Sequence, residues 1–374
     1  MLGIGIIGCG NISTAYLRLA PLFKGLEVRA VADMNPAAAQ AQAAAFDVRA
    51  HSVEDLLGAD DIDIVVNLTI PAAHFDVTRA ILQAGKHAYS EKPIVLTQQQ
   101  GAELRALASE KGLRVGSAPD TFLGGAHQAA RAAIDAGHIG DVVAGTAHVM
   151  NHGMEHWHPN PDFFFQPGAG PMLDIGPYYV TNLVQLLGPV TRVAALTTTP
   201  SPTRTILSEP RKGEEIPVET PTNIHALLDF ASGAAVTLST SWDVWAHRHG
   251  HMELYGTKGS MFLPDPNWFS GQVELEDAAG AKTVLDTDTH PFGVPNQDTE
   301  SDPKANYRMA GLADMAAALQ DGRAHRCSLE LALHVVDIMT AVLDAGEKGA
   351  MVPLSSTCAR SEPLGAAAAQ ALLK

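Results

Sequence analysis

The feature that most restricts the fold is a glycine turn between a short apolar segment and an amphipathic one. Residues 2–7 are largely apolar and too few for a stable helix, which predicts a buried parallel strand. Gly8-Cys9-Gly10 follows directly, and apolar side chains then recur at helical spacing as far as Phe23. A strand, a glycine turn and a helix in this order predict the start of a dinucleotide-binding unit.

The turn has glycine at two of the three positions that such a unit uses. Gly8 permits the tight turn, and Gly10 lets the backbone approach a pyrophosphate at the start of the helix. Asn11 and Ile12 begin that helix, so they are candidate cofactor-binding residues together with the two glycines. The third position holds Ser13, and the alternative interpretation is a glycine-rich turn in another α/β fold.

An acidic residue stands where such a unit binds ribose. Residues 26–32 predict a second strand, and Asp33 follows it at once. A carboxylate there can accept hydrogen bonds from the adenosine ribose hydroxyls and would repel a 2′-phosphate. Because neither Met34 nor Asn35 is basic, we expect NAD rather than NADP as the cofactor.

Composition narrows the class of protein. The chain has 374 residues, of which 46% are hydrophobic and 18% charged, which indicates two or three packed domains rather than disorder. The formal net charge of −16 disfavours nucleic acid and anionic lipid as partners. The three cysteines form no CxxC pair, so neither a disulfide framework nor a zinc site is expected. We find no membrane-length apolar run and no basic leader, and we expect a cytoplasmic protein.

Strands and helices alternate as far as residue 118. Further strands are predicted at 62–68, 87–90 and 114–118, with helices at 36–46, 71–84 and 98–111. This alternation predicts a doubly wound parallel sheet that binds its ligand at the carboxyl ends of the strands. The candidate cofactor contacts at those ends are Thr69, Pro71, His74, Glu91 and Lys92. For His74, capping of its own helix is the alternative role.

Short β-type segments dominate after residue 120. Strands are predicted at 142–150, 190–196, 224–230, 234–242, 251–255, 260–263, 272–276 and 283–286, and helices at 123–136, 174–187, 307–320, 329–347 and 366–374. The Pro-rich segments 200–222 and 287–306 are predicted connections. Many short strands predict one broad antiparallel or mixed sheet. The predicted fold is therefore α/β, with a nucleotide-binding domain at 1–120 and a substrate-binding and oligomerisation domain at 121–374.

Two segments have residues suited to catalysis. Lys92, in Glu91-Lys92-Pro93, is placed where substrate meets cofactor, although a Lys-Pro step also suits an exposed turn. Its ammonium can polarise a substrate hydroxyl. Asp174 is placed to cap the helix that follows, and Tyr178 is four residues further on, so the two share a helix face. Capping plus a packed tyrosine is an equally good interpretation.

A histidine-rich loop is the remaining candidate for substrate binding. His156, Trp157 and His158 offer hydrogen bonds and an aromatic stacking face. We prefer this role to metal binding because no carboxylate has the spacing of a known zinc motif. Asp120, after the last strand of the first series, is either a further substrate contact or a turn residue.

The chain resembles the glucose–fructose oxidoreductase, inositol dehydrogenase and MocA (Gfo/Idh/MocA) family over essentially its whole length. The resemblance rests on GIIGCGNIS near the start, AGKHAYSEKPIVLT at 84–97 and GAGPMLDIGPYYVTNLVQLLG at 168–188. It implies a Rossmann domain that binds NAD, followed by an α/β domain with a large open sheet. In the family that sheet usually forms the oligomer interface, which implies a homodimer or homotetramer.

The resemblance also implies roles for the catalytic candidates. Lys92 matches the lysine of the EKP motif, and Asp174 matches the aspartate of the second motif. Many members have histidine as acid/base where this chain has Tyr178, so the proton acceptor is in question. A tyrosine, with an ordinary pKa near ~10, needs a neighbouring cation to act as a base at neutral pH.

These observations favour an NAD-dependent oxidoreductase that removes a hydride from a CH–OH group of a sugar or polyol. Two alternatives stay open, namely a redox-neutral glycosidase that uses NAD transiently and a non-catalytic NAD sensor. We expect a compact neutral carbohydrate as substrate, because residues 151–191 contain no arginine to bind an anion. Arg18 and Arg248 are the arginines that folding could bring to the site.

Overall fold

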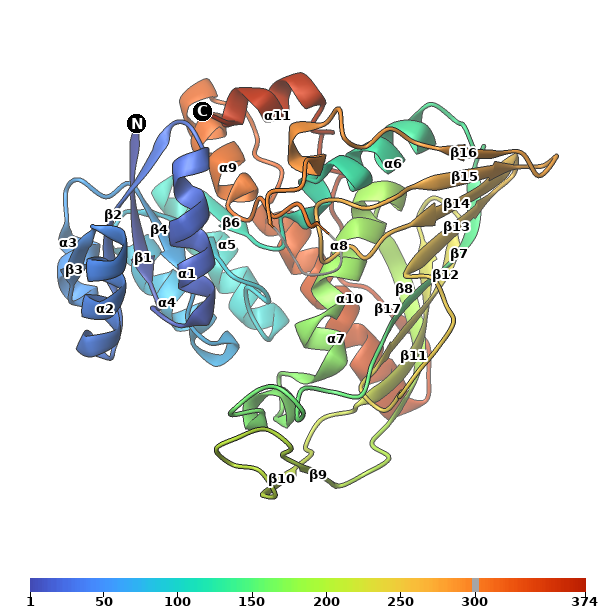
Figure 1. The fold of residues 1–374 in the computed structure, drawn as a ribbon, viewed down its shortest axis with the longest axis horizontal. Helices are drawn as coiled ribbons and strands as arrows, with labels where there is room; N and C mark the ends of the chain where they lie inside the picture. Colours follow the sequence, from blue (N-terminus) through green and yellow to red (C-terminus); the bar gives the residue numbers. More distant parts are fainter. Residues whose placement is uncertain (298–302) are drawn as a thin grey trace.

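The computed structural model describes residues 1–297 and 303–374 and contains two sheets side by side, each with its own helices (Figure 1). The N-terminal unit, residues 1–120, consists of β1 (Leu2–Ile7), α1 (Asn11–Leu19), η1 (Ala20–Leu22), β2 (Leu26–Ala32), α2 (Pro36–Phe46), β3 (Arg49–His51), α3 (Val53–Gly58), β4 (Ile64–Asn67), α4 (Pro71–Gln83), β5 (His87–Ser90), α5 (Gln98–Lys111) and β6 (Val115–Ser117).

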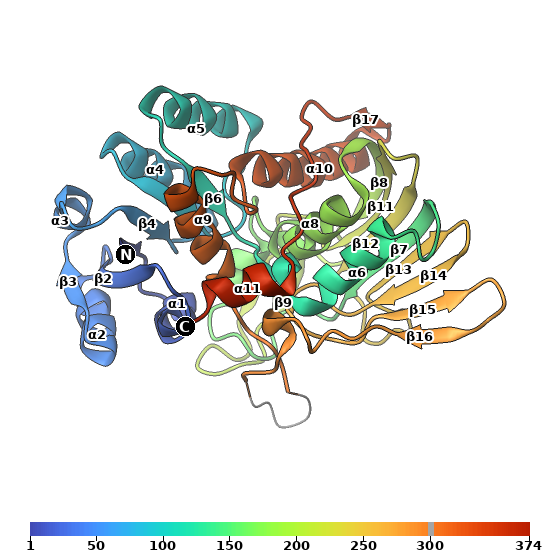
Figure 2. The ribbon, with the colours of Figure 1, turned by 90° about the horizontal axis from the view of Figure 1, so that it is seen from above.

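The N-terminal unit is a doubly wound parallel sheet with strand order β3-β2-β1-β4-β5-β6, as predicted. All four residues of β4 are buried, because helices cover both faces of the sheet (Figure 2). β1 pairs with β2 on one side and β4 on the other, so Ile7 lies beside both Ala32 and Asn67. The residues that follow these three strands therefore meet at one edge, where the order of strands reverses.

The C-terminal unit, from residue 121, is built on a larger sheet. Its elements are η2 (Thr121–Leu123), α6 (Gly125–Asp135), β7 (Val142–Met150), η3 (Asp162–Phe165), α7 (Gly170–Asp174), α8 (Gly176–Leu187), β8 (Val190–Thr198), β9 (Thr203–Thr205), β10 (Glu215–Pro217), β11 (Asn223–Phe230), β12 (Ala235–Ser241), β13 (Met252–Gly256), β14 (Gly259–Leu263), β15 (Glu274–Asp277), β16 (Lys282–Val284), η4 (Pro291–Gly293), α9 (Ala310–Asp321), α10 (Leu329–Lys348), β17 (Val352–Pro353) and α11 (Ala366–Leu372).

Nine of these strands form a mixed sheet in the order β16-β15-β14-β13-β7-β12-β11-β8-β17. Neighbouring strands are antiparallel except β7 and β12, which are parallel. Helices α6, α8 and α10 lie on one face (Figure 2). Burial alternates along β11, as expected where one face packs on helices and the other meets solvent. The prediction of a large, mainly antiparallel sheet is confirmed.

Three short pairings differ from the predicted elements, one of them that of the two-residue strand β17 with β8. The three-residue strand β3 was not predicted, because three residues show no detectable period. The segment 200–222, predicted as a connection, contains the antiparallel pair β9 and β10. The predicted connection 287–306 contains η4 and includes residues 298–302, which lie outside the described residues.

The helix predicted at 174–187 was placed wrongly at its start. Helix formation begins at Gly170, with Pro171 in the first turn, and a break then separates α7 from α8. Asp174 is the last residue of α7, so it does not cap α8, whose N-cap residue is Ile175. The backbone N–H of Tyr178 donates to the carbonyl of Ile175 across this break.

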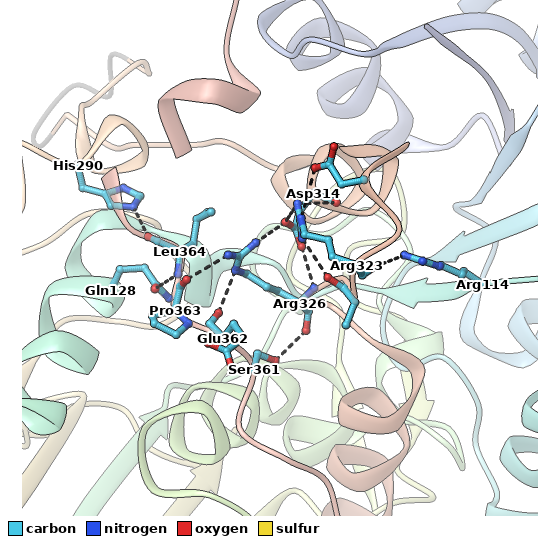
Figure 3. Close-up of polar contacts among 12 residues, drawn as sticks. Arg114, Gln128, His290, Asp314, Arg323, Arg326, Ser361, Glu362, Pro363 and Leu364 are labelled. Atoms are coloured by element: carbon cyan, nitrogen blue, oxygen red, sulfur yellow. Dashed lines mark hydrogen bonds and ion pairs between the residues drawn. The ribbon is translucent and has the colours of Figure 1, made fainter. Parts of the chain in front are cut away.

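Residues 352–374, which we call the C-terminal strap, are held at Glu362 and Pro363 by an arginine network (Figure 3). Arg326 donates to the carbonyl oxygens of Glu362 at 2.9 Å and Pro363 at 3.1 Å. The same guanidinium is paired with Asp314, whose side chain is fully buried. This network holds the strap against α9.

The end of the strap belongs to the N-terminal unit. Phe23 and Leu373 form an antiparallel bridge, and the backbone N–H of Lys24 donates to the carbonyl of Leu372 at 2.8 Å. The strap therefore ties the C-terminal unit to the segment between η1 and β2.

Candidate active site

The turn after β1 leaves open space where a pyrophosphate is expected. Gly8 has φ +104°, and a Cβ there would lie 2.6 Å from the carbonyl group of Leu68, so only glycine fits. A Cβ on Gly10 would meet no atom of the described residues within 4 Å. Ser13 is fully buried, and its hydroxyl donates to the carbonyl of Gly10 at 2.6 Å, which accounts for serine at the third position. The first backbone N–H groups of α1, those of Asn11 and Ile12, complete this cradle. The cradle therefore fits a dinucleotide.

Asp33 is held in a fixed orientation at the end of β2. Its Oδ2 accepts from the backbone N–H of Cys9 at 2.7 Å, and its Oδ1 accepts from the N–H of Asn35 at 2.8 Å. The carboxylate is half-buried beside the glycine turn, which suits a contact with ribose. Burial, and then the charge of Asp33, raise the pKa of the Cys9 thiol to about 11, which disfavours the reactive thiolate at neutral pH.

The loop after β4 is fixed by His74. Both ring nitrogens of this buried histidine face carbonyl oxygens, Nδ1 that of Pro93 at 2.7 Å and Nε2 that of Thr69 at 2.9 Å. A hydrogen bond from His74 to the cofactor is therefore not available in this arrangement, and its role is to join two loops. The hydroxyl of Thr69 donates to Asn67 at 2.6 Å, while Pro71 begins α4 and faces the cavity described below.

Lys92 lies just beyond β5, before a cis peptide bond to Pro93. Its Nζ donates to the Oδ1 of Asp174 at 2.9 Å and to the carbonyl of the same residue at 2.6 Å. The Nζ is also 5.3 Å from the centre of the Tyr178 ring. Although burial alone would lower the pKa of Lys92, the neighbouring Asp174, Tyr178 and Glu91 raise it above its ordinary value. The structure thus brings the three predicted catalytic residues together around a permanent cation.

Arg308 enters the same cluster, and sequence reasoning did not find it. Its guanidinium has Tyr178 as a hydrogen-bond partner and donates to the Oδ1 of Asn267 at 3.0 Å and of Asn306 at 3.2 Å. Met309 has φ +87°, uncommon for a residue with a side chain, and it ends the extended segment before α9. A local sequence pattern gives no signal for this turn.

A buried acidic group lies behind Lys92. Tyr16 donates to the Oε1 of Glu91 at 2.9 Å, and Glu91 Oε2 accepts from the backbone N–H of Lys92. Asp120 is almost fully buried and accepts from the N–H of Gly311 at 3.0 Å. Burial raises the pKa of Asp120 to about 6, although the Gly311 N–H and Arg308 oppose that shift. Asp120 therefore links β6 to α9 rather than opening onto the cavity.

A cavity of about 130 Å³ lies beside Lys92 and Asp174. Its other walls come from the start of α4 and from the segment before α7, including Phe163, Phe164 and Gly168. Residues of both units therefore enclose it, at the carboxyl end of the parallel sheet.

The histidine-rich loop is placed differently from the prediction. His158 packs edge-on against Phe163 and Phe164, so it supports the cavity wall from behind. Trp157 is 55% exposed, and His156 lines a separate groove. The two phenylalanines are the aromatic residues of this loop that reach the cavity, and their apolar character alone could not separate them from core residues.

The described ranges 1–297 and 303–374 contain neither a metal-type cluster nor a membrane-length helix. Within them, no three histidine, cysteine, aspartate or glutamate side chains gather in a way that could hold a metal ion. None of the helices there is long and apolar enough to cross a bilayer.

The fold and the cradle define a dinucleotide-binding protein, and comparison with family models identifies it as an NAD-binding oxidoreductase. Residues 2–118 match the oxidoreductase family with an NAD-binding Rossmann fold, and residues 127–262 match the GFO/IDH/MocA C-terminal domain. The chain belongs to the Gfo/Idh/MocA family.

Characterised relatives act on sugars and related compounds. Levoglucosan dehydrogenase of Pseudarthrobacter phenanthrenivorans is 26% identical over 78% of this chain and 82% of its own length. A dTDP-3,4-didehydro-2,6-dideoxy-α-D-glucose 3-reductase of Saccharopolyspora spinosa is 32% identical over 51% of this chain, and the match spans 58% of that relative. Several of the curated relatives are thus matched over only about half of their length.

Solved structures share the whole fold. An NAD-binding oxidoreductase from Klebsiella pneumoniae superposes with a TM-score of 0.81 at 21% identity, covering 95% of this chain and 99% of that one. Levoglucosan dehydrogenase in complex with NADH and L-sorbose gives a TM-score of 0.79 at 21% identity, with the same coverage.

Proposed function

We propose that this protein is an NAD-dependent dehydrogenase that oxidises a hydroxyl-bearing carbon of a neutral sugar or cyclic polyol. The observation that carries the proposal is the ammonium of Lys92, fixed by Asp174 beside Tyr178 at the cavity. A buried cation at the carboxyl end of a nucleotide-binding sheet is suited to hold a substrate oxygen. The sugar dehydrogenases among the relatives support the substrate class.

Each residue of the cluster has a distinct task in this proposal. Lys92 donates a hydrogen bond to the substrate oxygen and stabilises the negative charge that grows on it as the C–H bond breaks. Asp174 orients Lys92 through two contacts and keeps it charged. Tyr178 receives or relays the hydroxyl proton, and its anionic form would have two cationic neighbours, Lys92 and Arg308. Bound NAD⁺ supplies the hydride acceptor.

The charges around the cavity favour a neutral substrate. Arg308, rather than Arg18 or Arg248, is the arginine that folding brings to the cluster, but it does not line the cavity. Among the described residues that line the cavity, Lys92 is the cation, and it is paired with Asp174. An anionic substrate therefore gains little from this cation.

A turnover screen tests this function. Purified protein is incubated with NAD⁺ and neutral aldoses, inositols, sugar phosphates and aldonates, and NADH formation is followed by absorbance. We expect the highest kcat/KM for a neutral ring. A sugar phosphate or acid preferred over every neutral ring would contradict the substrate class, and sugar release without NADH would favour a redox-neutral glycosidase.

We also propose that a second copy of the chain covers the open face of the nine-stranded sheet. Leu196 and Leu227, on neighbouring strands β8 and β11, are 73% and 55% exposed there. Exposed apolar side chains on one sheet face are typical of an interface. Light scattering of the purified protein tests this, and a monomer at micromolar concentration would contradict it. The cytoplasmic location stays a prediction.

A further inference from the structure

A lobe that contains β9 and β10 extends from the C-terminal unit (Figure 1). It carries a second concave site, which shares no lining residue with the cavity at Lys92. This lobe has a small core of its own, formed by Met154, Phe165, Ile206, Ile216 and Trp242. A groove of about 870 Å³ opens above that core, and we call it the lobe groove. The residues of the lobe groove that matter here are Asn151, His152, Glu155, Arg204, Asp243 and Trp245. None of them lines the cavity at Lys92.

The floor of the lobe groove is a buried charged network. Arg204, only 8% exposed, is paired with Glu155 at 3.1 Å and with Asp243, and it also donates to the carbonyl of Trp242. Thr222 donates to the other carboxylate oxygen of Asp243 at 2.7 Å. Two carboxylates against one guanidinium leave the floor with a net negative charge, which disfavours an anionic ligand.

The network is not fully satisfied by the protein. Among the described residues, Glu155 Oε2 and Arg204 Nε find no hydrogen-bond partner, although both side chains are more than nine-tenths buried. Buried polar atoms of folded proteins are nearly always paired, and exceptions mark water, an ion or a ligand. Both residues line the lobe groove, so a ligand bound there would place polar groups beside this incompletely paired network.

One wall of the groove is an aromatic platform. Trp245 is 80% exposed, and the imidazole of His152 stacks on one face of its indole with ring centres 3.4 Å apart. The exposed area of Trp245 must then lie largely on its other face. A flat aromatic face beside polar groups is suited to a ring with one apolar face and many hydroxyls.

We propose that the lobe groove binds a neutral saccharide, with one sugar ring stacked on Trp245 and hydroxyls directed at the Glu155, Arg204 and Asp243 network. This site is separate from the catalytic cavity and does not depend on the proposed function. The two share one segment, because His158 packs on Phe163 and Phe164 of the cavity wall, while the same loop supplies Glu155 to the groove.

The test measures binding of maltose, cellobiose and glucose 6-phosphate to the NAD-free protein by calorimetry and tryptophan fluorescence. Trp245→Ala removes the platform, and its high exposure means that the fold should tolerate the change. Trp157→Ala is the matched control, since Trp157 is also exposed but does not line the groove. We expect at least one neutral disaccharide to bind about tenfold more weakly to Trp245→Ala and unchanged to Trp157→Ala.

Three results would overturn the proposal. The first is binding that is equal in wild type and Trp245→Ala, or absent for both disaccharides. The second is stronger binding of glucose 6-phosphate than of either neutral sugar. The third is a change of oligomeric mass in Trp245→Ala, which would make Trp245 a subunit contact. A wild-type protein without dehydrogenase turnover but with Trp245-dependent sugar binding would refute only the proposed function.

Discussion

The two ends of the catalytic site are built in different ways. At the cofactor end, Gly8, Gly10 and Asp33 lie within 33 residues, at the ends of two adjacent strands. At the substrate end, Lys92, Asp174, Tyr178 and Arg308 come from segments spread over more than 200 residues. The cofactor end is therefore a local property of one βαβ unit, whereas the substrate end exists only when both units are packed. We therefore expect substitutions at the substrate end to leave NAD binding intact, and substitutions at the cofactor end to leave the substrate residues in place.

The largest effect is expected from Lys92→Ala at the substrate end. Removal of the cation that holds the substrate oxygen should lower kcat by roughly 10³-fold. NAD binding, measured by fluorescence titration, should change little, because the cradle after β1 is untouched. Lys111→Ala, at the exposed end of α5, is the matched control. Wild-type kcat in Lys92→Ala would exclude the catalytic role.

Asp120, which links β6 to α9, should make stability depend on pH. Its pKa of about 6 in the folded protein lies above its ordinary value of 3.8, so the folded state binds the proton more tightly. The free energy of unfolding should therefore fall as pH rises from about 4 to about 7. The Asp120→Asn variant has no carboxylate to ionise, so its stability should not fall in this way. The free energy of unfolding of the variant minus that of wild type should therefore be larger at pH 8 than at pH 4 by on the order of 2–3 kcal/mol.

Urea denaturation of wild type and Asp120→Asn at both pH values checks this prediction. The amide can still accept from the N–H of Gly311, so the link to α9 is preserved. A stability difference that is the same at pH 4 and pH 8 would mean that Asp120 does not titrate in this range.

At the cofactor end, Asp33 should set the preference for NAD. Wild type should show higher kcat/KM with NAD⁺ than with NADP⁺, because the carboxylate repels a 2′-phosphate. Asp33→Asn keeps an acceptor for the N–H of Cys9 but removes the charge. The ratio of kcat/KM with NAD⁺ to kcat/KM with NADP⁺ should therefore fall about tenfold. Steady-state kinetics with both cofactors measures this, and a wild-type preference for NADP⁺ would refute the ribose assignment.

The smallest effect is expected from Arg308→Lys. A lysine keeps the charge but lacks the planar guanidinium that contacts Asn267, Asn306 and Tyr178 together. We therefore expect kcat to fall about fivefold, which corresponds to about 1 kcal/mol of activation free energy. KM for NAD⁺ should be unchanged. If KM for NAD⁺ rises while kcat stays constant, Arg308 belongs to the cofactor end instead.

The same contrast explains what could be predicted from sequence. The strands Leu26–Ala32 and His87–Ser90 and the helix Gln98–Lys111 have the predicted bounds, because buried strands and capped helices have local patterns. The EKP motif and the second motif, which contains Asp174, were identified through family resemblance, and no local pattern shows that they meet in space. Their contact became visible only in the packed structure.

The features of the site that the sequence did not predict share a physical cause. Arg308 reaches the site because Met309 adopts a left-handed conformation, and Asp174 faces Lys92 because the helix breaks after it. His156 was predicted at the substrate by its residue type, but the loop turns it toward the lobe groove. In each case tertiary packing overrides the local pattern.

The C-terminal strap has a consequence for how the protein is made. The N-terminal unit leaves the ribosome first, yet the segment at Phe23 and Lys24 pairs with residues 372–373, which are synthesised about 350 residues later. At ~5–20 residues per second, that separation corresponds to roughly 20–70 s of translation. During this interval the segment at Phe23 and Lys24 lacks residues 372–373, with which it pairs in the folded protein. That segment of the nascent chain is therefore open to chaperones and proteases until the strap has been synthesised.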